Sequence, residues 1–411
     1  MPRQLRALDL FSGIGGFTLA LHGLARTVAM CDIDPDSHAV LQGRMDDGLL
    51  DKCPIFKDVK KLQASDLPEP VDLIVSGFPC QDVSSLGLRR GIKGKRSGLV
   101  NEVFRLLDET AAKVLLIENV PNLVAKGMRY ILSELVTKRG FNVTWAVVPA
   151  SAVGAQHSRK RVFILARRPE FTHVFPAAQH LAFKWRAPPP RMVPAGQTAT
   201  DHRCKRVQQL GNSVVPDAVR AAFITLVSGF AVTPAQVAAS KTLLVKSFKE
   251  PDQARLKPVD SKAPLGMWGH ATPKGTWTLV DPPAMRVPDL KLTFSPAVFD
   301  GERRQQPRPG VAPSPYVTTP VHARSWSTPR SVTSAARELT ERMVRDLPTQ
   351  VRFEVSTPDA LRSGQISPYF VEWLMGYPKG WTRMPVGHRP GQIAGYRPNR
   401  KQRPAFEKAE W

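Results

Sequence analysis

The sequence of 411 residues is poor in cysteine, and its few cysteines are scattered. None of the four forms a Cys-x-x-Cys pair, and no nearby histidine completes a zinc pattern. This scarcity argues against a disulfide framework or a metal site, and it predicts free thiols in a reducing compartment. No apolar run has the length of a membrane span, and the N-terminal stretch lacks the apolar region of a signal peptide. We therefore expect a cytoplasmic protein, or a nuclear one if the host has a nucleus.

Acidic residues are also in deficit, because 35 Asp and Glu face 58 Lys and Arg, which gives a net charge of +23. A surplus of this size favours a polyanionic partner, with nucleic acid as the first candidate. Lysines that are merely solvated remain the alternative. The length exceeds that of one ordinary core and predicts two domains.

The first 168 residues alternate short apolar runs with segments that place apolar residues at helical spacing. This alternation predicts an α/β fold, a doubly wound and mostly parallel sheet with helices on both faces. Sheets of this kind bind ligands at the carboxyl ends of their strands. The expected strands are residues 5–11, 27–33, 71–75, 113–120, 142–148 and 161–166.

Beyond the helix expected at 216–230 the composition changes, since residues 221–411 hold 23 of the 38 prolines. Few long periodic segments follow, which indicates a smaller, loop-rich and basic C-terminal domain. We predict a catalytic domain at 1–230, a second region at 231–385 and a flexible basic tail at 386–411.

A glycine-rich turn follows the first expected strand in "LDLFSGIGGFTLAL" (8–21). Gly13 and Gly15 allow close backbone approach to a ligand, and the next helix offers free N–H groups. Asp32, at the end of the second strand, is placed to bind ribose hydroxyls. Asp58, after a short third strand, could accept a hydrogen bond from an amino group such as that of adenine. The pattern favours a nucleoside-bearing cofactor over a purely structural turn with solvated acids.

Cys80 stands in "GFPCQDVS" (77–84), just beyond the expected strand at 71–75. A cysteine there can simply be a small buried residue. Its surroundings favour a nucleophile, because Glu118, Arg159 and Arg161 also lie at expected strand ends and a Lys- and Arg-rich stretch follows. A thiolate, a carboxyl group and two guanidinium groups beside a nucleoside cofactor describe covalent catalysis on an electron-poor ring.

The motifs taken together resemble those of the DNA (cytosine-5) methyltransferases, which use S-adenosylmethionine and have a Rossmann-like fold. The matching segments occur in family order over residues 7–220: "DLFSGIGGFTLAL", "CDIDP", "KDV", "GFPCQDVSSLGLRRGIKGKRSGLVNEVFRLL", "IENVPNLV", "GAQHSRKRVFILARR" and "QQLGNSVVPDAV". Their number and order make the resemblance highly specific.

The resemblance implies roles for individual residues. Cys80 would attack carbon 6 of cytosine, Glu118 would contact ring nitrogen 3, and Arg159 and Arg161 would position the base, which must be flipped out of duplex DNA. Residues matching the cofactor site are Phe11, Gly13, Gly15, Asp32, Ile33, Asp58, Asn212, Ser213 and Val214. Residues matching the loop that closes on DNA are Pro79, Gln81, Ser84, Arg89 and Arg90.

Two features depart from the family pattern. His157 stands where the family usually has glutamine, which we interpret as a tolerated variant of neutral effect at the surface. Only 49 residues separate Arg161 from Gly211, too few for the recognition domain that usually lies there. The segment "ISPYFVEWLMGYPKGWT" (366–382) resembles one that normally precedes "GNSV", and neighbouring segments resemble those of phage and large-virus members.

We therefore expect 231–385 to be a displaced target-recognition region in a monomer that acts on double-stranded DNA. A small apolar helix that packs on the core is the alternative for 366–382. A catalytically weak DNA-binding paralogue and a transfer-RNA cytosine-5 methyltransferase remain open as alternative functions.

Overall fold

The computed structural model describes residues 4–79, 99–171, 189, 192–193, 202–228, 266–273, 275–279, 365–385 and 388. The predicted strands all form within this part, together with the short third strand. The main sheet contains β1 (Leu5–Leu10), β2 (Ala25–Cys31), β3 (Ile55–Phe56), β4 (Leu73–Ser76), β5 (Val114–Asn119), β6 (Asn142–Val148), β7 (Arg161–Arg167), β9 (Trp268–Thr272) and β10 (Gly275–Leu279).

These strands lie in the order β10-β9-β6-β7-β5-β4-β1-β2-β3. The strands from β3 to β5 in this order are parallel to their neighbours, whereas β7 runs antiparallel to both β5 and β6. β9 runs antiparallel to β6 and β10 antiparallel to β9. The predicted α/β class with a mostly parallel sheet is confirmed, and β1, β2, β4 and β5 end at one common edge.

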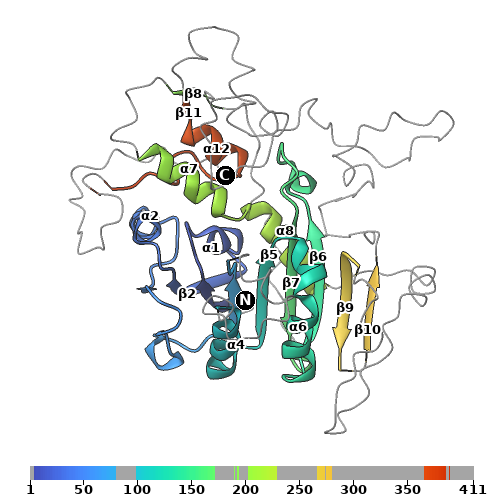
Figure 1. The fold of residues 1–411 in the computed structure, drawn as a ribbon. Helices are drawn as coiled ribbons and strands as arrows, with labels where there is room; N and C mark the ends of the chain where they lie inside the picture. Colours follow the sequence, from blue (N-terminus) through green and yellow to red (C-terminus); the bar gives the residue numbers. More distant parts are fainter. Residues whose placement is uncertain are drawn as a thin grey trace, which may run out of the picture.

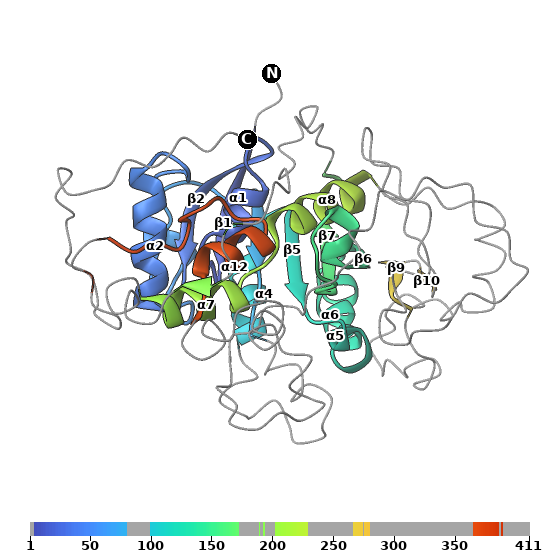
Figure 2. The ribbon, with the colours of Figure 1, turned by 90° about the horizontal axis from the view of Figure 1, so that it is seen from above.

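Helices cover both faces of the sheet, as Figure 2 shows from above. One hydrophobic core includes Phe17 and Phe223 from helices on one face, and the other includes Phe104 and Ile131 from helices on the opposite face. The helices are α1 (Gly16–Ala20), α2 (Pro35–Asp46), α4 (Leu99–Thr110), α5 (Asn122–Lys126), α6 (Met128–Leu132), α7 (Arg203–Asn212), α8 (Pro216–Ser228) and α12 (Pro368–Leu374). Shorter helical turns are η1 (Ala64–Asp66), η3 (Ser133–Thr137) and η4 (Ala150–Val153).

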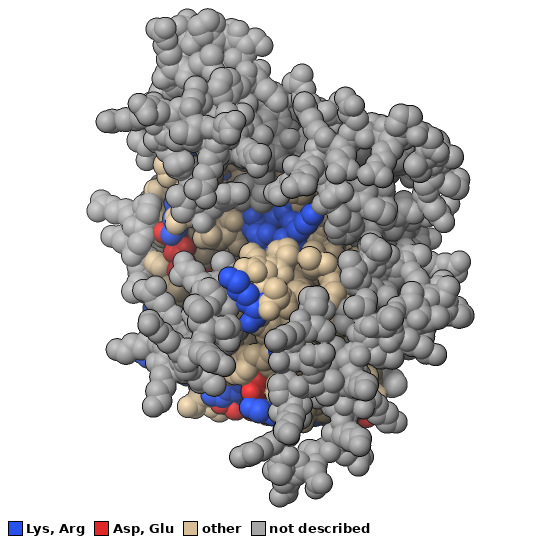
Figure 3. Space-filling model, turned by 45° about the vertical axis from the view of Figure 1, so that its right-hand side comes forward, with Lys and Arg blue, Asp and Glu red and all other residues tan. Residues whose placement is uncertain are grey.

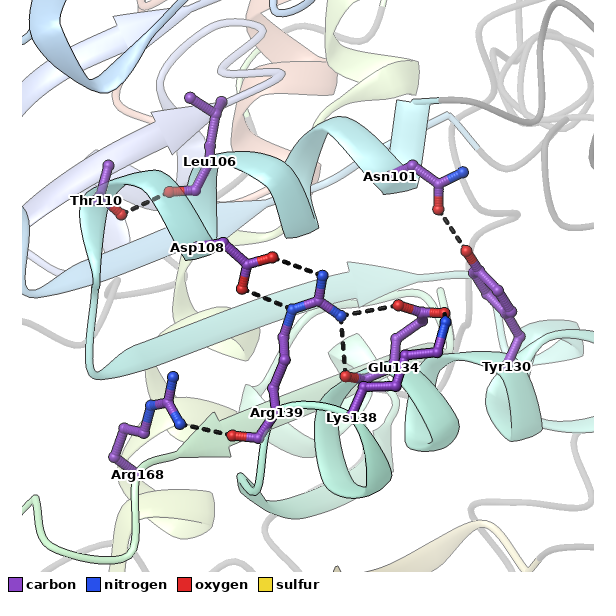
Figure 4. Close-up of polar contacts among 9 residues, drawn as sticks. All are labelled: Asn101, Leu106, Asp108, Thr110, Tyr130, Glu134, Lys138, Arg139 and Arg168. Carbon is purple, nitrogen blue, oxygen red and sulfur yellow. Dashed lines mark hydrogen bonds and ion pairs between the residues drawn. The ribbon is translucent and has the colours of Figure 1, made fainter. Parts of the chain in front are cut away.

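An ion-pair network joins α4 to η3 on the face of the sheet that carries Phe104 and Ile131 (Figure 4). Arg139 donates from Nε and Nη2 to the two carboxylate oxygens of Asp108 on α4, at 2.8 and 2.7 Å, and from Nη1 to Glu134 in η3 at 2.8 Å. Its guanidinium lies 5.2 Å from the ring centre of Phe104. The carboxylates raise the pKa of Arg139, so the network stays charged and ties α4 to η3.

Segments far along the chain join the same fold. β9 pairs with β6, and Gly269 permits this because a Cβ there would lie 2.1 Å from the ring of Trp145. The two-residue strand β11 (Gln365–Ile366) pairs with β8 (Met192–Val193), and α12 lies beside α7 over one end of the sheet (Figure 1). Ile366, Phe370 and Trp381 belong to the core that contains Phe17. Of the two interpretations of 366–382, packing on the core is the one that the structure shows.

One helical stretch, Arg203–Val227, is long and apolar enough to cross a membrane by length and composition, although 72% of its most apolar window is buried in the fold. Core helices pass the same test.

Candidate active site

The glycine-rich turn after β1 has an unusual backbone. Phe11, Gly13 and Gly15 have φ angles of 58°, 52° and 82°, in the left-handed region that glycine tolerates best. The Gly15 N–H donates to the Ser12 carbonyl at 2.8 Å, and the Ser12 hydroxyl donates to the Asp9 carbonyl at 2.7 Å. The turn therefore carries its own hydrogen bonds and leads directly into α1.

Asp32, just after β2, holds this turn from the neighbouring strand. Its carboxylate accepts from the Gly13 N–H at 2.7 Å and from the Asp34 N–H at 2.8 Å. Burial raises the pKa of Asp32, while these two hydrogen bonds oppose the rise. The acid of the second strand thus lies in direct contact with the glycine turn.

The surroundings of this turn fit a nucleoside-bearing ligand. A Cβ on Gly13 would meet nothing within 4 Å, so the backbone is open on that side, whereas one on Gly15 would lie 2.9 Å from Leu50. Ile33 leaves 81% of its surface exposed, which offers an apolar contact for a flat ring. Asp58 follows β3 and fixes its own loop by accepting from the Lys60 N–H at 3.0 Å.

Glu118 and Arg161 form an ion pair at the ends of two adjacent strands. Arg161 Nε lies 2.8 Å from Glu118 Oε1, and the Glu118 residue is 9% exposed. Burial raises the pKa of Glu118, and Arg161 and Arg159 oppose that rise. The predicted carboxyl group and arginine are therefore brought together, on β5 and at the start of β7.

Arg159 is buried and points toward the predicted late motif instead. Its Nη2 donates to the carbonyls of Gly211 and Ser213, at 3.0 and 2.6 Å. Burial, reinforced by Arg161, lowers the pKa of Arg159 to about 9, which still leaves it charged at neutral pH. Arg159 thus connects the strand that carries the arginine pair to residues 211–214. Both arginines nevertheless act on Glu118, because each opposes the rise of its pKa.

The motif of Asn212, Ser213 and Val214 lies between α7 and α8. Asn212 is exposed, and the Ser213 hydroxyl donates to the Leu210 carbonyl at 2.9 Å. Val214 is buried, and its Cγ2 would be 2.6 Å from a Cβ on Gly16. The motif therefore packs directly against the start of α1, beside the glycine turn.

Asn119 fixes the backbone that leads to the predicted nucleophile. Its Nδ2 donates to the Phe78 carbonyl at 3.0 Å, and its Oδ1 accepts from the Val120 N–H at 2.9 Å. Pro79 is exposed at the end of the described stretch. The next residue, Cys80, lies outside the described residues, and so do Gln81, Ser84, Arg89 and Arg90.

A sequence profile of the family described as C-5 cytosine-specific DNA methylase matches residues 5–192. The type II methyltransferase M.CviJI of Paramecium bursaria Chlorella virus IL3A is 28% identical over 381 residues, covering 91% of this chain and 96% of the viral protein. Residues 5–192 therefore form a C-5 cytosine-specific DNA methylase domain.

Two further similarities cover part of the chain. The type II methyltransferase M2.BsuMI of Bacillus subtilis is 36% identical over 171 residues, covering 39% of this chain and 42% of the bacterial one. A crystal structure of the Dnmt2 methyltransferase of S. pombe has 26% identity and a TM-score of 0.33, and it covers 42% of this chain and 53% of that one. The alignment with the viral protein also includes the C-terminal half, and the matching domain is that of a DNA cytosine-5 methyltransferase.

Sequence reasoning missed several residues of the methylase that contact the cofactor loop. The segment 366–384 reaches the loop from more than 300 residues away, where Trp381 Nε1 donates to the Ile14 carbonyl at 2.8 Å. It also reaches the neighbouring late motif, where the Tyr377 hydroxyl donates to the Val214 carbonyl at 3.0 Å. Its resemblance to a family motif was visible in the sequence, but its contacts depend on tertiary structure. Asp9 was also missed. Its residue is fully buried, it accepts from the Thr18 hydroxyl at 2.9 Å, and burial raises its pKa to about 7.

The prediction that His157 is neutral at the surface is wrong. The residue is 1% exposed, and its Nε2 lies 2.9 Å from the carbonyl of Leu374 in α12. The methylase therefore uses this ring to join the arginine motif to the C-terminal segment. Among the described residues, no group of three or more histidines, cysteines and acids could hold a metal ion.

Proposed function

We propose that this DNA methylase transfers a methyl group from S-adenosylmethionine to carbon 5 of a flipped cytosine through a covalent adduct at Cys80. The Glu118–Arg161 pair carries the proposal, because a buried carboxyl group with a guanidinium partner lies at the same sheet edge as the glycine turn. β4 ends at this edge with Ser76, and Cys80 stands a few residues later in the sequence.

The residues around the glycine turn would hold the methyl donor. Phe11, Gly13 and Gly15 shape the loop, Asp32 retains acceptor capacity for ribose hydroxyls beyond its two N–H contacts, and exposed Ile33 can cover the adenine. Two further groups complete the site: Asp58 as acceptor for the adenine amino group, and Asn212, Ser213 and Val214 for the methionine part. The bound sulfonium compound supplies an electrophilic methyl group.

The chain's own groups would make carbon 5 reactive. The Cys80 thiolate forms a bond to carbon 6, and the ring electrons move toward nitrogen 3, where Glu118 donates a proton. The raised pKa of Glu118 favours this protonated form. Arg161 holds Glu118 in place, and both groups would stabilise the charge that develops on the cytosine ring. After carbon 5 accepts the methyl group, water takes the carbon-5 proton and the thiolate leaves carbon 6. Glu118 takes back the nitrogen-3 proton, which restores the neutral aromatic ring.

Duplex DNA is the proposed substrate, because the +23 charge suits a polyphosphate and a stacked cytosine must be flipped to meet a thiolate. Basic side chains are visible on the face shown in Figure 3. Pro79, Gln81, Ser84, Arg89 and Arg90 would form the loop that closes on DNA. We propose that the protein acts as a monomer, in the cytoplasm or wherever its target DNA lies, as a modification enzyme like the type II methyltransferases it resembles.

Sequence recognition would come from the displaced region 231–385. β10 and β11 flank its undescribed stretch 280–364. β10 runs parallel to β6, so Leu279 lies at the carboxyl edge of the sheet, and α12 after β11 lies beside α7. Both ends of this stretch therefore join the fold near the proposed catalytic edge, which supports a role in contacting the target.

The test compares wild type with Cys80→Ala in cells that lack cytosine methylation, by mapping 5-methylcytosine at base resolution. We expect methylation at one short sequence, reduced at least about a thousandfold in the variant. Cys204→Ala, which changes an exposed thiol on α7, is the matched control and keeps wild-type methylation.

A second experiment tests the adduct itself. A duplex with 5-fluorocytosine at the mapped position cannot lose its carbon-5 substituent as a proton, so the covalent complex accumulates and survives denaturation. Trapping by Cys80→Ala would refute the assigned nucleophile. Folded wild type that methylates no DNA would shift the assignment to transfer RNA or to a DNA-binding paralogue.

A further inference from the structure

The segment of residues 366–384, called the strap below, lies against the glycine turn and contacts it through buried aromatic residues. Trp381 is fully buried, and its indole N–H donates to the Ile14 carbonyl at 2.8 Å. Ile14 lies between Gly13 and Gly15. Both glycines have left-handed backbone conformations, so this part of the turn does not continue the hydrogen-bond pattern of a strand or a helix. The turn is thus held from two sides, by Asp32 through the Gly13 N–H and by Trp381 through the Ile14 carbonyl.

Tyr377 makes the second contact, at the point where the turn becomes α1. Its hydroxyl donates to the Val214 carbonyl at 3.0 Å, and the same oxygen would lie 2.4 Å from a Cβ on Gly16. The absence of a side chain at Gly16 lets Tyr377 reach this position. The Tyr377 phenol therefore packs between the start of α1 and the motif of Asn212, Ser213 and Val214, and it sets the spacing between them.

The strap is itself held rigidly. The carboxylate of Glu372 accepts from Arg206 Nη2 at 3.0 Å and from the backbone N–H groups of Gly380 and Thr382, at 2.6 and 2.8 Å. Arg44 on α2 donates to the carbonyls of Gly380 and Trp381. Because the backbone at Trp381 is fixed from several directions, its indole presents a preset donor to Ile14.

We propose that Trp381 and Tyr377 are positioning residues for the methyl donor, which set the conformation of the glycine turn without touching the reacting atoms. This inference rests on the proposed function, in which the donor binds at that turn. The strap also bonds to the arginine motif through Leu374 and His157, so the donor side and the base side of the site share one rigid support.

The experiment measures affinity for S-adenosylhomocysteine by calorimetry on the full chain without DNA. Trp381→Phe keeps an aromatic ring and removes the N–H, while Tyr377→Phe removes only the hydroxyl. We expect each change to weaken binding about tenfold, with the affinity for duplex DNA changed by less than roughly twofold. Trp373→Phe is the matched control, since Trp373 lies in the same segment with its ring stacked 5.6 Å from that of Phe370, and it should leave the affinity unchanged.

Thermal unfolding of all variants separates positioning from general destabilisation. A loss of affinity in Trp373→Phe equal to that in Trp381→Phe would show a merely structural role and overturn the inference, as would unchanged affinity in both Trp381→Phe and Tyr377→Phe. Wild type that binds no S-adenosylhomocysteine would instead overturn the proposed function, because the donor site would be wrong from the start.

Discussion

A single buried imidazole, that of His157, joins two motifs of the methylase that are far apart in sequence. Burial lowers the pKa of His157 to about 3, helped by the positive charge of Arg159. The ring is therefore neutral near pH 7, and Nε2 can donate to the Leu374 carbonyl. In the unfolded chain the pKa returns to about 6.5, so the unfolded state binds a proton first as the pH falls.

His157→Gln tests this account at the residue that departs from the family pattern. Glutamine can also donate to the Leu374 carbonyl, so we expect a similar free energy of unfolding at about pH 7.5. Below about pH 6.5 the wild type should lose stability relative to the variant, by up to about 1.4 kcal/mol per pH unit. Denaturant titrations at about pH 7.5 and about pH 5 check this, and parallel pH dependence of the two proteins would contradict the neutral, buried ring.

Sequence reasoning anticipated the pairing of Glu118 with Arg161 better than the contacts of Arg159. Glu118 and Arg161 pair as their strand-end positions suggested, because adjacent strands bring their ends together. Arg159, two residues earlier, instead bonds to carbonyls at 211 and 213. No spacing rule fixes this choice, because it depends on where α7 packs.

At the scale of elements, the ion pair between α7 and α12 is a contact that a single substitution can break. Arg206 and Glu372 are both fully buried, and the Arg206 guanidinium also lies 4.7 Å from the ring centre of Tyr369. Glu372→Gln removes the charge opposite a buried guanidinium and replaces one acceptor with a donor. We expect a loss of about 3–5 kcal/mol in the free energy of unfolding, because a buried charge is left without its counter-charge.

Denaturant unfolding measures this loss, and Glu102→Gln serves as the control. Glu102 pairs with Arg105 on α4 near the surface, where such a pair contributes about 0–1 kcal/mol. Equal losses in the two variants would mean that burial of the α7–α12 pair has no special importance.

The strands of the first 168 residues were predictable because each is a short apolar run bounded by turn residues. α7 and β9 were not predicted. α7 has the polar sequence Arg203–Asn212, and β9 contains Gly269 and His270, so neither resembles the short apolar runs of the first 168 residues. β9 exists because β6 offers an unpaired edge, and His270 is accommodated by a bond between its Nδ1 and the Thr144 hydroxyl, with 2.9 Å between them.

For the whole molecule, the order of motifs in the chain differs from their order in space. β11 at the start of the strap pairs with β8, which lies between the arginine motif and α7. The strap thus returns to the place where the usual family order would have put it. Sequence alone predicted a displacement but could not show this return, because no local pattern encodes a pairing across more than 170 residues.

This arrangement predicts that recognition and chemistry can be separated. Replacing residues 280–364 with a flexible Gly/Ser linker of about 30 residues leaves the sequences of β10 and of the strap unchanged, and loop-closure entropy depends only weakly on linker length. We expect this variant to keep its thermal unfolding transition and its binding of S-adenosylhomocysteine, because the residues around the glycine turn and the strap are unchanged. It should lose the preference for one short sequence in a genome-wide map of 5-methylcytosine. Retention of that preference would place the recognition element elsewhere in the chain, whereas loss of donor binding would mean that the replaced stretch supports the glycine turn.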